Sequence, residues 1–138
     1  MSVEENVALV RRFAEDAWNR GELAVIDETH APTYRNHAPS RPEVMRTRDD
    51  LRRQVTGMRA DYPDLQIVSE DLIAADDKVV MRYALSGTHA TRGKRVAITG
   101  VSIFRIEAGQ GVEYWGHADN LTLARQLGDL PPAAPTDR

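Results

Sequence analysis

The sequence predicts an α+β domain in which N-terminal helices pack on a strongly curved antiparallel sheet, with a cavity between the two layers. Apolar residues recur with the helical period in the first half of the chain, and from about residue 65 the period becomes two, as in strands. Short turns separate the later segments, which favours antiparallel neighbours. Helices followed by a run of strands are typical of α+β domains.

Three helices are expected in the first half. The first covers about residues 3–20, and Ser2 can cap its start. Its apolar face is formed by Val3, Val7, Val10, Phe13, Ala14, Ala17 and Trp18. A shorter helix is expected over residues 23–29. A third follows Thr47 and ends at Pro63, because proline cannot continue a helix.

The second half carries the strand candidates. They cover residues 65–73, 78–88, 95–106 and 112–119. The length of the chain suits one domain, which we assign to residues 1–128. Residues 129–138 are rich in proline and alanine and have no periodicity, so we expect a disordered tail.

The composition argues against several kinds of partner and site. A formal net charge of −3 gives no bias toward nucleic acid, and a chain without cysteine has no disulfide, thiolate metal site or cysteine nucleophile. His30, His37, His89 and His117 lack metal-ligand spacing, so no metal is expected. The acidic N-terminus does not resemble a signal peptide, and no apolar run is long enough for a membrane span, so we expect a cytoplasmic protein.

The last strand candidate carries the clearest site signal. Strand alternation puts Trp115, His117 and Asp119 on one face. If that face is the interior, a carboxylate and an imidazole lie beside an aromatic wall, which suits proton transfer. In the alternative interpretation, Asp119 caps a terminal helix over residues 121–127, because aspartate favours that position.

Further candidates for substrate contacts lie elsewhere in the chain. Residues 34–37 are expected to be extended, so Tyr34 and Asn36 share one face and His37 takes the other. Asn36 is the best candidate donor to a substrate oxygen, although the following proline loop can satisfy either it or His37 locally. Trp18 belongs to the core or to the cavity wall.

Pairing the final hairpin around Gly109 and Gln110 would place Ser102 opposite His117, which makes Ser102 another candidate contact.

Several motifs, in order along the chain, resemble those of the SnoaL-like polyketide cyclases. They lie at residues 5–13, 18–23, 34–37, 62–65, 86–89, 100–106, 114–115 and 119–121. The resemblance covers roughly residues 4–128. It implies the cone-shaped α+β barrel of the nuclear transport factor 2-like superfamily, whose apolar cavity serves cyclases, isomerases, epoxide hydrolases and non-catalytic binding proteins alike.

The resemblance also implies a mechanism, an intramolecular aldol cyclisation of a hydrophobic, polyketide-like small molecule without metal or organic cofactor. In the cyclases an aspartate near the end of the last strand acts as general acid and base, and Asp119 holds the matching position. An apolar cavity would raise the pKa of this carboxyl group toward neutral. His117 would then tune Asp119 or bind a substrate oxygen.

Two other functions remain open. The pair Tyr34 and Asn36 resembles the water-holding pair of limonene-epoxide hydrolases, but the Arg-x-Asp that these enzymes need is incomplete, because Ala84 stands two positions after Arg82. A non-catalytic binding module is the third class, favoured if no second polar group lies within reach of Asp119.

A homodimer through the exposed face of the sheet is also expected. The last two strand candidates carry apolar side chains on both faces, more than one core requires. These residues are Val101, Ile103, Phe104, Ile106, Val112 and Tyr114. Related cyclases associate in this way, which strengthens the expectation.

Overall fold

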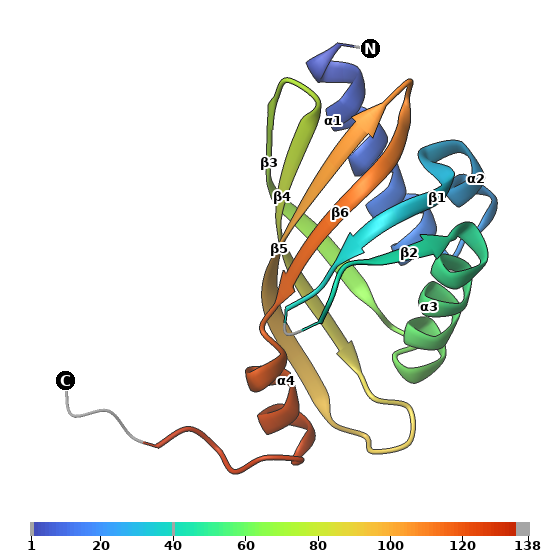
Figure 1. Ribbon diagram of the computed structural model, residues 1–138. Helices are drawn as coiled ribbons and strands as arrows, with labels where there is room; N and C mark the ends of the chain where they lie inside the picture. Colours follow the sequence, from blue (N-terminus) through green and yellow to red (C-terminus); the bar gives the residue numbers. More distant parts are fainter. Residues whose placement is uncertain (1, 40, 135–138) are drawn as a thin grey trace.

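The computed structural model describes residues 2–39 and 41–134 (Figure 1). Its elements are, in chain order, α1 (Val3–Arg12), the π-helix η1 (Phe13–Asn19), α2 (Ala24–Thr29), β1 (His30–His37), β2 (Val44–Thr47), α3 (Arg48–Asp61), β3 (Gln66–Ala75), β4 (Lys78–Thr88), β5 (Arg95–Glu107), β6 (Gln110–Ala118) and α4 (Asn120–Leu127). The three expected N-terminal helical regions and the four expected strands are all present. Two further strands, β1 and β2, occupy the region between α2 and α3.

The strands form one curved sheet in the order β2-β1-β6-β5-β4-β3, with the N-terminal helices on its inner side (Figure 1). The predicted α+β class is therefore confirmed. Because β2 and β3 are edge strands, the predicted barrel is open rather than closed. Most neighbouring strands are antiparallel as predicted, but β1 and β6 run parallel. The two come from distant parts of the chain, so the argument from short turns does not apply to them.

Side-chain caps fix where the helices begin. Ser2 accepts a hydrogen bond from the backbone N–H of Glu5 at 3.1 Å, as the sequence predicts for the start of α1. At α3, Thr47 accepts from the N–H of Asp50 (3.1 Å) and the Asp50 carboxylate accepts from the N–H of Thr47 (2.9 Å). This capping box sets the direction in which α3 leaves β2.

The core lies between the helices and the inner face of the sheet. Along β4 and β5, buried and more exposed residues alternate, as strands with one buried face require. The inward residues of these two strands include Val79, Met81, Tyr83, Leu85, Val96, Ile98 and Phe104. Helices α1, η1, α2 and α3 add Val10, Phe13, Ile26 and Val55 from the other side. Burial of these side chains provides most of the driving force that holds the two layers together.

The β5–β6 hairpin differs from its predicted register. Its turn is Ala108 and Gly109, both with positive φ (48° and 75°), rather than Gly109 and Gln110. An irregularity beside Arg105 then adds one residue to β6. As a result Ser102 pairs with Gly116, and His117 pairs with Val101, whose side chain faces outward. A one-residue shift of register turns every side chain of a strand to the opposite face.

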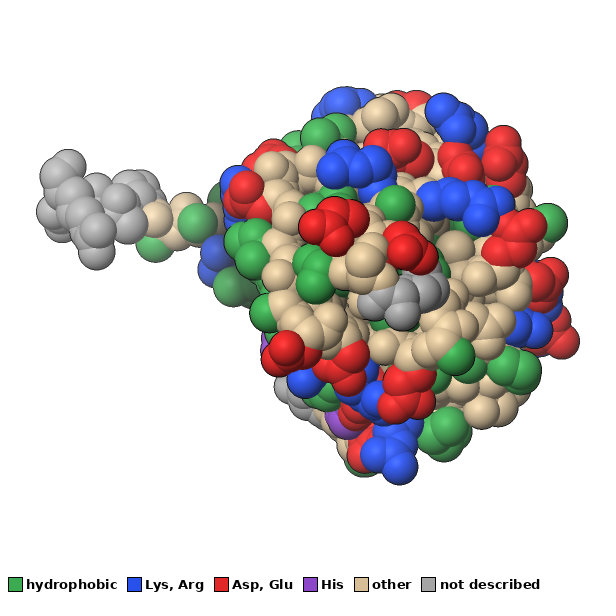
Figure 2. Space-filling view, turned by 90° about the horizontal axis from the view of Figure 1, so that it is seen from above, with side chains coloured by type: hydrophobic (Ala, Val, Ile, Leu, Met, Phe, Trp, Pro, Cys, Tyr) green, Lys and Arg blue, Asp and Glu red, His purple; other side chains and the backbone are tan. Residues whose placement is uncertain are grey.

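One end of the molecule carries charges of both signs, and the C-terminal segment leads away from the body (Figures 1 and 2). Seen from above, the end of the molecule in Figure 2 mixes acidic and basic side chains without a large patch of one sign. After Gly128 closes α4 with φ of 85°, residues 131–134 form no helix or strand and lead away from the body (Figure 1). Residues 135–138 lie outside the described residues, so the disorder expected for 129–138 stays a prediction. No helix in the described part of the chain is long and apolar enough to cross a membrane.

Candidate functional site

A cavity of about 380 Å³ lies between the inner face of the sheet and the helices. Its wall is mostly aromatic and aliphatic, with contributions from η1, α3 and the strands β1, β4, β5 and β6. The loop after β1 and the start of α4 also contribute, through Pro39, Arg41 and Asn120. A concave, largely apolar space with a few polar groups is the usual form of a small-molecule site.

Six of the eight predicted site residues line this cavity. They are Trp18, Tyr34, Asn36, His37, Ser102 and His117. The side chain of His117 is exposed, so it lies at the rim rather than inside. Trp115 and Asp119 do not line the cavity. The expectation that Trp115, His117 and Asp119 share an interior face is wrong, because the added residue in β6 turns Trp115 and Asp119 away from the cavity and leaves His117 at its rim.

Trp115 packs against the outer side of β1 instead. Its indole stacks on the imidazole of His37, with ring centroids 5.0 Å apart and planes 4° apart. His37 Nε2 also lies 2.7 Å from an oxygen of Glu113. Burial raises the pKa of Glu113, but hydrogen bonds from His37 and Arg105 outweigh this effect and lower the pKa overall. Trp115, the residue predicted to form the aromatic wall, therefore belongs to a polar cluster outside the cavity, and His37 is the member of this cluster that also lines the cavity.

The same cluster contains a group of possible metal ligands in the described residues, namely His37, Glu43 and Glu113, whose ligand atoms lie within 4.8 Å of one another. Each carboxylate already has a cationic partner, because Arg35 lies 3.3 Å from Glu43 and Arg105 lies 2.9 Å from Glu113. These arginines supply the positive charge that a metal would bring.

Asp119 is exposed and caps α4. Its Oδ1 accepts from the N–H of Thr122 at 3.1 Å, and its Oδ2 accepts from the Thr122 hydroxyl at 2.7 Å. These hydrogen bonds, first the one from the side chain and then the one from the backbone, lower the pKa of Asp119. The raised pKa expected for an enclosed carboxyl group is therefore wrong. The alternative interpretation, in which Asp119 caps the terminal helix, describes its hydrogen bonds, while its catalytic role stays a prediction.

Three of the tyrosines that line the cavity, Tyr34, Tyr83 and Tyr114, carry hydroxyl groups on strands of its wall. Burial raises the pKa of Tyr34 and of Tyr114, and it raises the pKa of Tyr83 to about 12. All three phenols are therefore protonated at neutral pH and can donate a hydrogen bond. The Tyr114 hydroxyl lies 2.8 Å from Ser102 Oγ. One of the two hydroxyls donates to the other, and the second keeps its proton for another acceptor.

Two glycines on the inner face make room for these phenols. A Cβ on Gly100 would lie 2.3 Å from the Tyr83 hydroxyl, and a Cβ on Gly116 would lie 2.5 Å from the Tyr114 hydroxyl. Both distances are too short for any side chain, so each phenol lies over a glycine of the same sheet. Gly100 therefore does not widen the cavity, because the phenol from β4 fills the space.

His30 is the buried imidazole of the site. The Thr29 hydroxyl lies 2.9 Å from the carbonyl oxygen of Val25, which can only accept, so the hydroxyl proton is committed there. Thr29 Oγ1 must then accept from His30 Nδ1, 3.0 Å away. This fixes the tautomer with the proton on Nδ1 and leaves the lone pair of Nε2 free. Burial, with a smaller contribution from Arg48, lowers the pKa of His30 to about 4, so the ring is neutral at neutral pH.

Nε2 is the unpaired nitrogen of the His30 ring, with no hydrogen-bond partner among the described residues. Two side-chain atoms in the described part of the chain are sealed from solvent and have no hydrogen-bond partner, Asn6 Oδ1 and Arg125 Nε. His30 Nε2 is not one of them, so it is not completely sealed. His30 lines the cavity, and its Nε2 lies on the side of β6, 3.7 Å from where a Cβ on Gly111 would be. The imidazole packs edge-on against Phe13, with centroids 4.5 Å apart.

Sequence reasoning missed His30, Arg46, Tyr83 and Tyr114 as cavity residues. Alternation could have found two of them, because His30 precedes Tyr34 by an even number of residues in β1, and Tyr83 lies between the buried Met81 and Leu85. Arg46 could not be found in this way, because no strand was expected where β2 lies. Tyr114 was placed on the outer face by the register error.

Comparison with known proteins agrees with this architecture. The solved structure of TsrD from Streptomyces laurentii has a TM-score of 0.83 and 28% identity, over 94% of this chain and 99% of that one. AclR from Streptomyces galilaeus, for which a hydroxylase activity has been suggested, has a TM-score of 0.83 and 28% identity, over 96% and 87% of the chains. IdmH from Streptomyces antibioticus, a suggested polyketide cyclase, has a TM-score of 0.80 and 26% identity, over 89% and 98%.

Among curated proteins, none matches the chain. The sequence profile of the SnoaL-like polyketide cyclases matches residues 8–127, which is most of the chain and includes every strand and all but the first turns of α1. The chain therefore belongs to the SnoaL-like polyketide cyclase family.

Proposed function

We propose that this protein binds a polyketide-like small molecule in its cavity and catalyses an intramolecular aldol cyclisation, or a related isomerisation, without a cofactor. The observation that carries the proposal is the set of buried, protonated phenols around one apolar space. Such donors hold a carbonyl oxygen and stabilise the negative charge that it acquires when a neighbouring carbon loses a proton. Because the donors are already in place, no reorganisation is needed at the moment of reaction.

In the proposed reaction a base removes a proton from the carbon between two carbonyl groups. The resulting enolate carbon attacks a second carbonyl of the same molecule, which forms a C–C bond and leaves an alkoxide. The alkoxide then takes a proton, so the sequence needs no oxidant, reductant or other reactant. The cavity holds the two carbons together, which reduces the entropic part of the barrier. His30 Nε2 accepts a hydrogen bond from an enol or hydroxyl group of the ligand.

We propose Asp119 as the base. Its neighbours Ala118 and Asn120 both line the cavity, so rotation of its side chain away from Thr122 would carry the carboxylate toward the rim. In its capping position the hydrogen bonds from Thr122 lower its pKa and keep it ionised at neutral pH. An aspartate without a strongly raised pKa is a sufficient base when preformed donors stabilise the enolate. Asn36 and the rim residue His117 would bind other substrate oxygens.

The structure gives less support to the two other functions, an epoxide hydrolase and a non-catalytic binding module. An epoxide hydrolase of the limonene-epoxide type needs carboxylates in the cavity, and no Asp or Glu lines it in the described part of the chain. Arg82 lies on the outer face, where it forms ion pairs with Glu70 (2.6 Å) and Asp71 (2.7 Å). A non-catalytic binding module would use the same cavity and the same donors, and it is separated from an enzyme by turnover alone.

Narrowing the cavity tests the proposed site. In Gly100→Ala the new methyl group displaces the Tyr83 phenol toward the free space, because the two would otherwise overlap. We expect roughly 10-fold weaker binding of a linear tetraketone and at least an equal fall in its cyclisation, since such overlap costs about 1–3 kcal/mol. Calorimetry and product formation measure the two effects. Gly57→Ala on α3 is the control, because its Cβ meets no atom within 4 Å. Equal activity of both variants would show that the reaction occurs elsewhere.

We also propose a homodimer through the outer face of the sheet. Apolar side chains from four strands gather there, namely Val68, Ile73, Val80, Val101, Ile103 and Trp115. Ile73 is 62% exposed and Val68 is 49% exposed, which is unusual for large apolar residues on a sheet.

Light scattering at micromolar concentration should return the mass of a dimer. Val101→Glu should shift it to the monomer, because a charge would be buried in an apolar interface. Val3→Glu, at an equally exposed valine on α1, should leave the dimer intact (Val3 is 39% exposed and Val101 is 38%). A monomer mass for the unaltered protein would contradict the proposal.

A further inference from the structure

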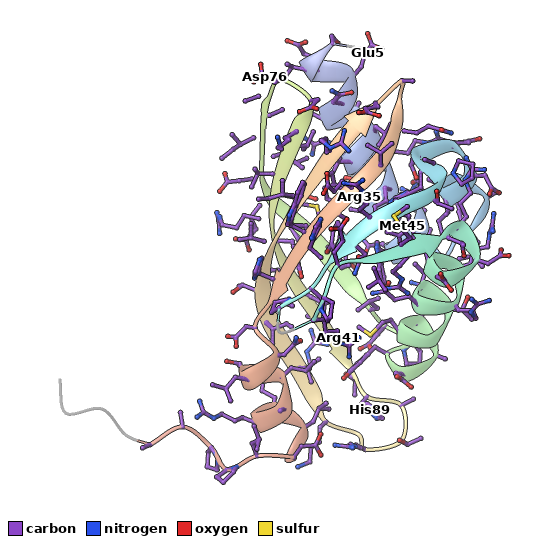
Figure 3. The ribbon with its side chains drawn as sticks, in the orientation of Figure 1. Glu5, Arg35, Arg41, Met45, Asp76 and His89 are labelled. Atoms are coloured by element: carbon purple, nitrogen blue, oxygen red, sulfur yellow. The ribbon has the colours of Figure 1, made fainter. Side chains whose placement is uncertain are left out.

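Arg46 enters the cavity from the edge of the sheet. In the β1–β2 pair it stands opposite Tyr34, whose side chain is 3% exposed and points inward. Residues paired across two strands project to the same face, so Arg46 follows Tyr34 into the interior. The adjacent pair, Arg35 and Met45, projects to the other side, where both residues are exposed (Figure 3). Arg46 is half-buried and is a lining residue of the cavity.

Arg46 also lacks the kind of partner that other arginines of the protein have. Its hydrogen bonds reach the side-chain oxygen of Gln54 at 3.4 Å and the carbonyl oxygen of Asp50 at 3.5 Å, both near the limit for such a bond. The Asp50 carboxylate is occupied by the backbone of Thr47 and by Arg53, 2.6 Å away. Within the described residues, Arg46 forms no ion pair. Its guanidinium therefore keeps donors and a full charge for another group.

The charged side chains that line the cavity are basic, although Asp50 and Glu113 lie just behind its wall, near Tyr34 and His37. Arg41, in the loop below β1 in Figure 3, lines the mouth, and Arg46 lines the wall. No Asp or Glu is a lining residue in the described ranges 2–39 and 41–134. The apolar wall lowers the local dielectric constant, so a half-buried guanidinium there attracts an anion more strongly than a cation on the open surface does.

We propose that the cavity binds its small-molecule ligand as a carboxylate anion, with the guanidinium of Arg46 holding the carboxylate group. The planar fork of an arginine donates two parallel hydrogen bonds to a carboxylate, a geometry that a neutral ester or amide does not match in charge. The rest of the ligand lies along the aromatic wall toward Tyr83 and His30. This inference rests on the proposed function, since it takes the cavity as the ligand site, and it adds that the substrate is a keto acid rather than its ester.

The test compares two probes that differ in charge and by one methyl group, anthraquinone-2-carboxylic acid and its methyl ester. Their affinities are measured at neutral pH by calorimetry and by quenching of tryptophan fluorescence, to which Trp18 in the cavity wall and Trp115 outside it both contribute. We expect the acid to bind at least about 10-fold more tightly than the ester, the scale of one charge-assisted hydrogen-bonded pair. The preference should shrink in high salt, because the mouth is open to solvent.

Two variants assign the effect to the proposed residue. Arg46→Met should weaken binding of the acid about 10-fold or more and change binding of the ester less than about two-fold. Arg35→Met removes the same charge from the outer face of the same strand pair, and it should leave both affinities unchanged. Circular dichroism and thermal unfolding confirm that each variant is folded. If Arg46→Met does not fold, the acid and ester affinities of the unaltered protein still decide.

The outcomes separate this inference from the proposed function. Equal affinities for acid and ester, or an equal loss of both in Arg46→Met, would overturn the anionic ligand while leaving the cavity as a binding site. If Gly100→Ala weakens neither probe, both bind outside the cavity and the proposed function fails as well. A third outcome is that Arg35→Met abolishes the preference for the acid and Arg46→Met does not. The anion would then bind on the outer face of the sheet, which would overturn the inference.

Discussion

Asp119→Asn should reduce cyclisation of a linear tetraketone roughly 100-fold or more while leaving its affinity nearly unchanged, the usual scale for loss of a general base. The substitution separates the two roles that compete for this carboxylate. Asparagine caps a helix about as well as aspartate does, so it can keep the hydrogen bond from the Thr122 N–H at the start of α4. Its amide has no basicity at neutral pH, so only the proton transfer is lost.

The matched variant is Asp119→Ala, which removes both the base and the cap. If Asp119 acts as the base, the two variants lose similar turnover, and only the alanine variant also loses thermal stability. If Asp119 is only a cap, Asp119→Asn cyclises at the parent rate. Single-turnover rates, affinities and melting temperatures of the three proteins distinguish the cases, and a parent rate in Asp119→Asn would end the proposal for this residue.

The sequence predicted the helices and the four long strands because their signals are local. Apolar spacing, the Ser2 cap and the Thr47 cap all act within a few residues, and each is present in the structure. The strand β2 was missed because Val44–Thr47 is short and lies on the sheet edge, where apolar alternation is weak. Its absence from the prediction also hid Arg46, whose inward direction depends on pairing with β1.

The candidate site was harder to predict because one residue decides which side chains face the cavity. The turn can be centred at Ala108 and Gly109 or one residue later, and the irregularity near Arg105 has no signature in the alternation of β6. Moving the turn by one position shifts the register by two and keeps every side chain on its face, so the extra residue alone decides whether Tyr114 or Trp115 points inward. Tyr34 and Asn36 were expected on one face of an extended segment, and both line the cavity. Their shared face follows from strand alternation alone and does not depend on the position of a turn.

His30 brings a polar group into the cavity wall, and its burial should make the fold sensitive to acid. The pKa of its imidazole is about 4 in the folded protein, lowered first by burial and then by Arg48, against an ordinary value of 6.5. A lowered pKa of a histidine means that the unfolded chain binds a proton more readily than the folded one. Stability from this group is therefore intact above pH 6.5 and is lost as pH falls toward 4.

We expect this one residue to lower the free energy of unfolding by about 2 kcal/mol between pH 7 and pH 5. Urea unfolding of the unaltered protein and of His30→Leu at several pH values measures the difference, since leucine removes the titrating group and keeps an apolar side chain against Phe13. His117→Gln removes an exposed histidine and should follow the unaltered protein. If His30→Leu does not fold, a proton NMR titration of the His30 ring gives its pKa in the folded protein, from which the change in unfolding free energy follows. Parallel curves for the unaltered protein and His30→Leu would show that the imidazole is hydrated in the folded state, so that the cavity beside it is wet and cannot hold a desolvated enolate.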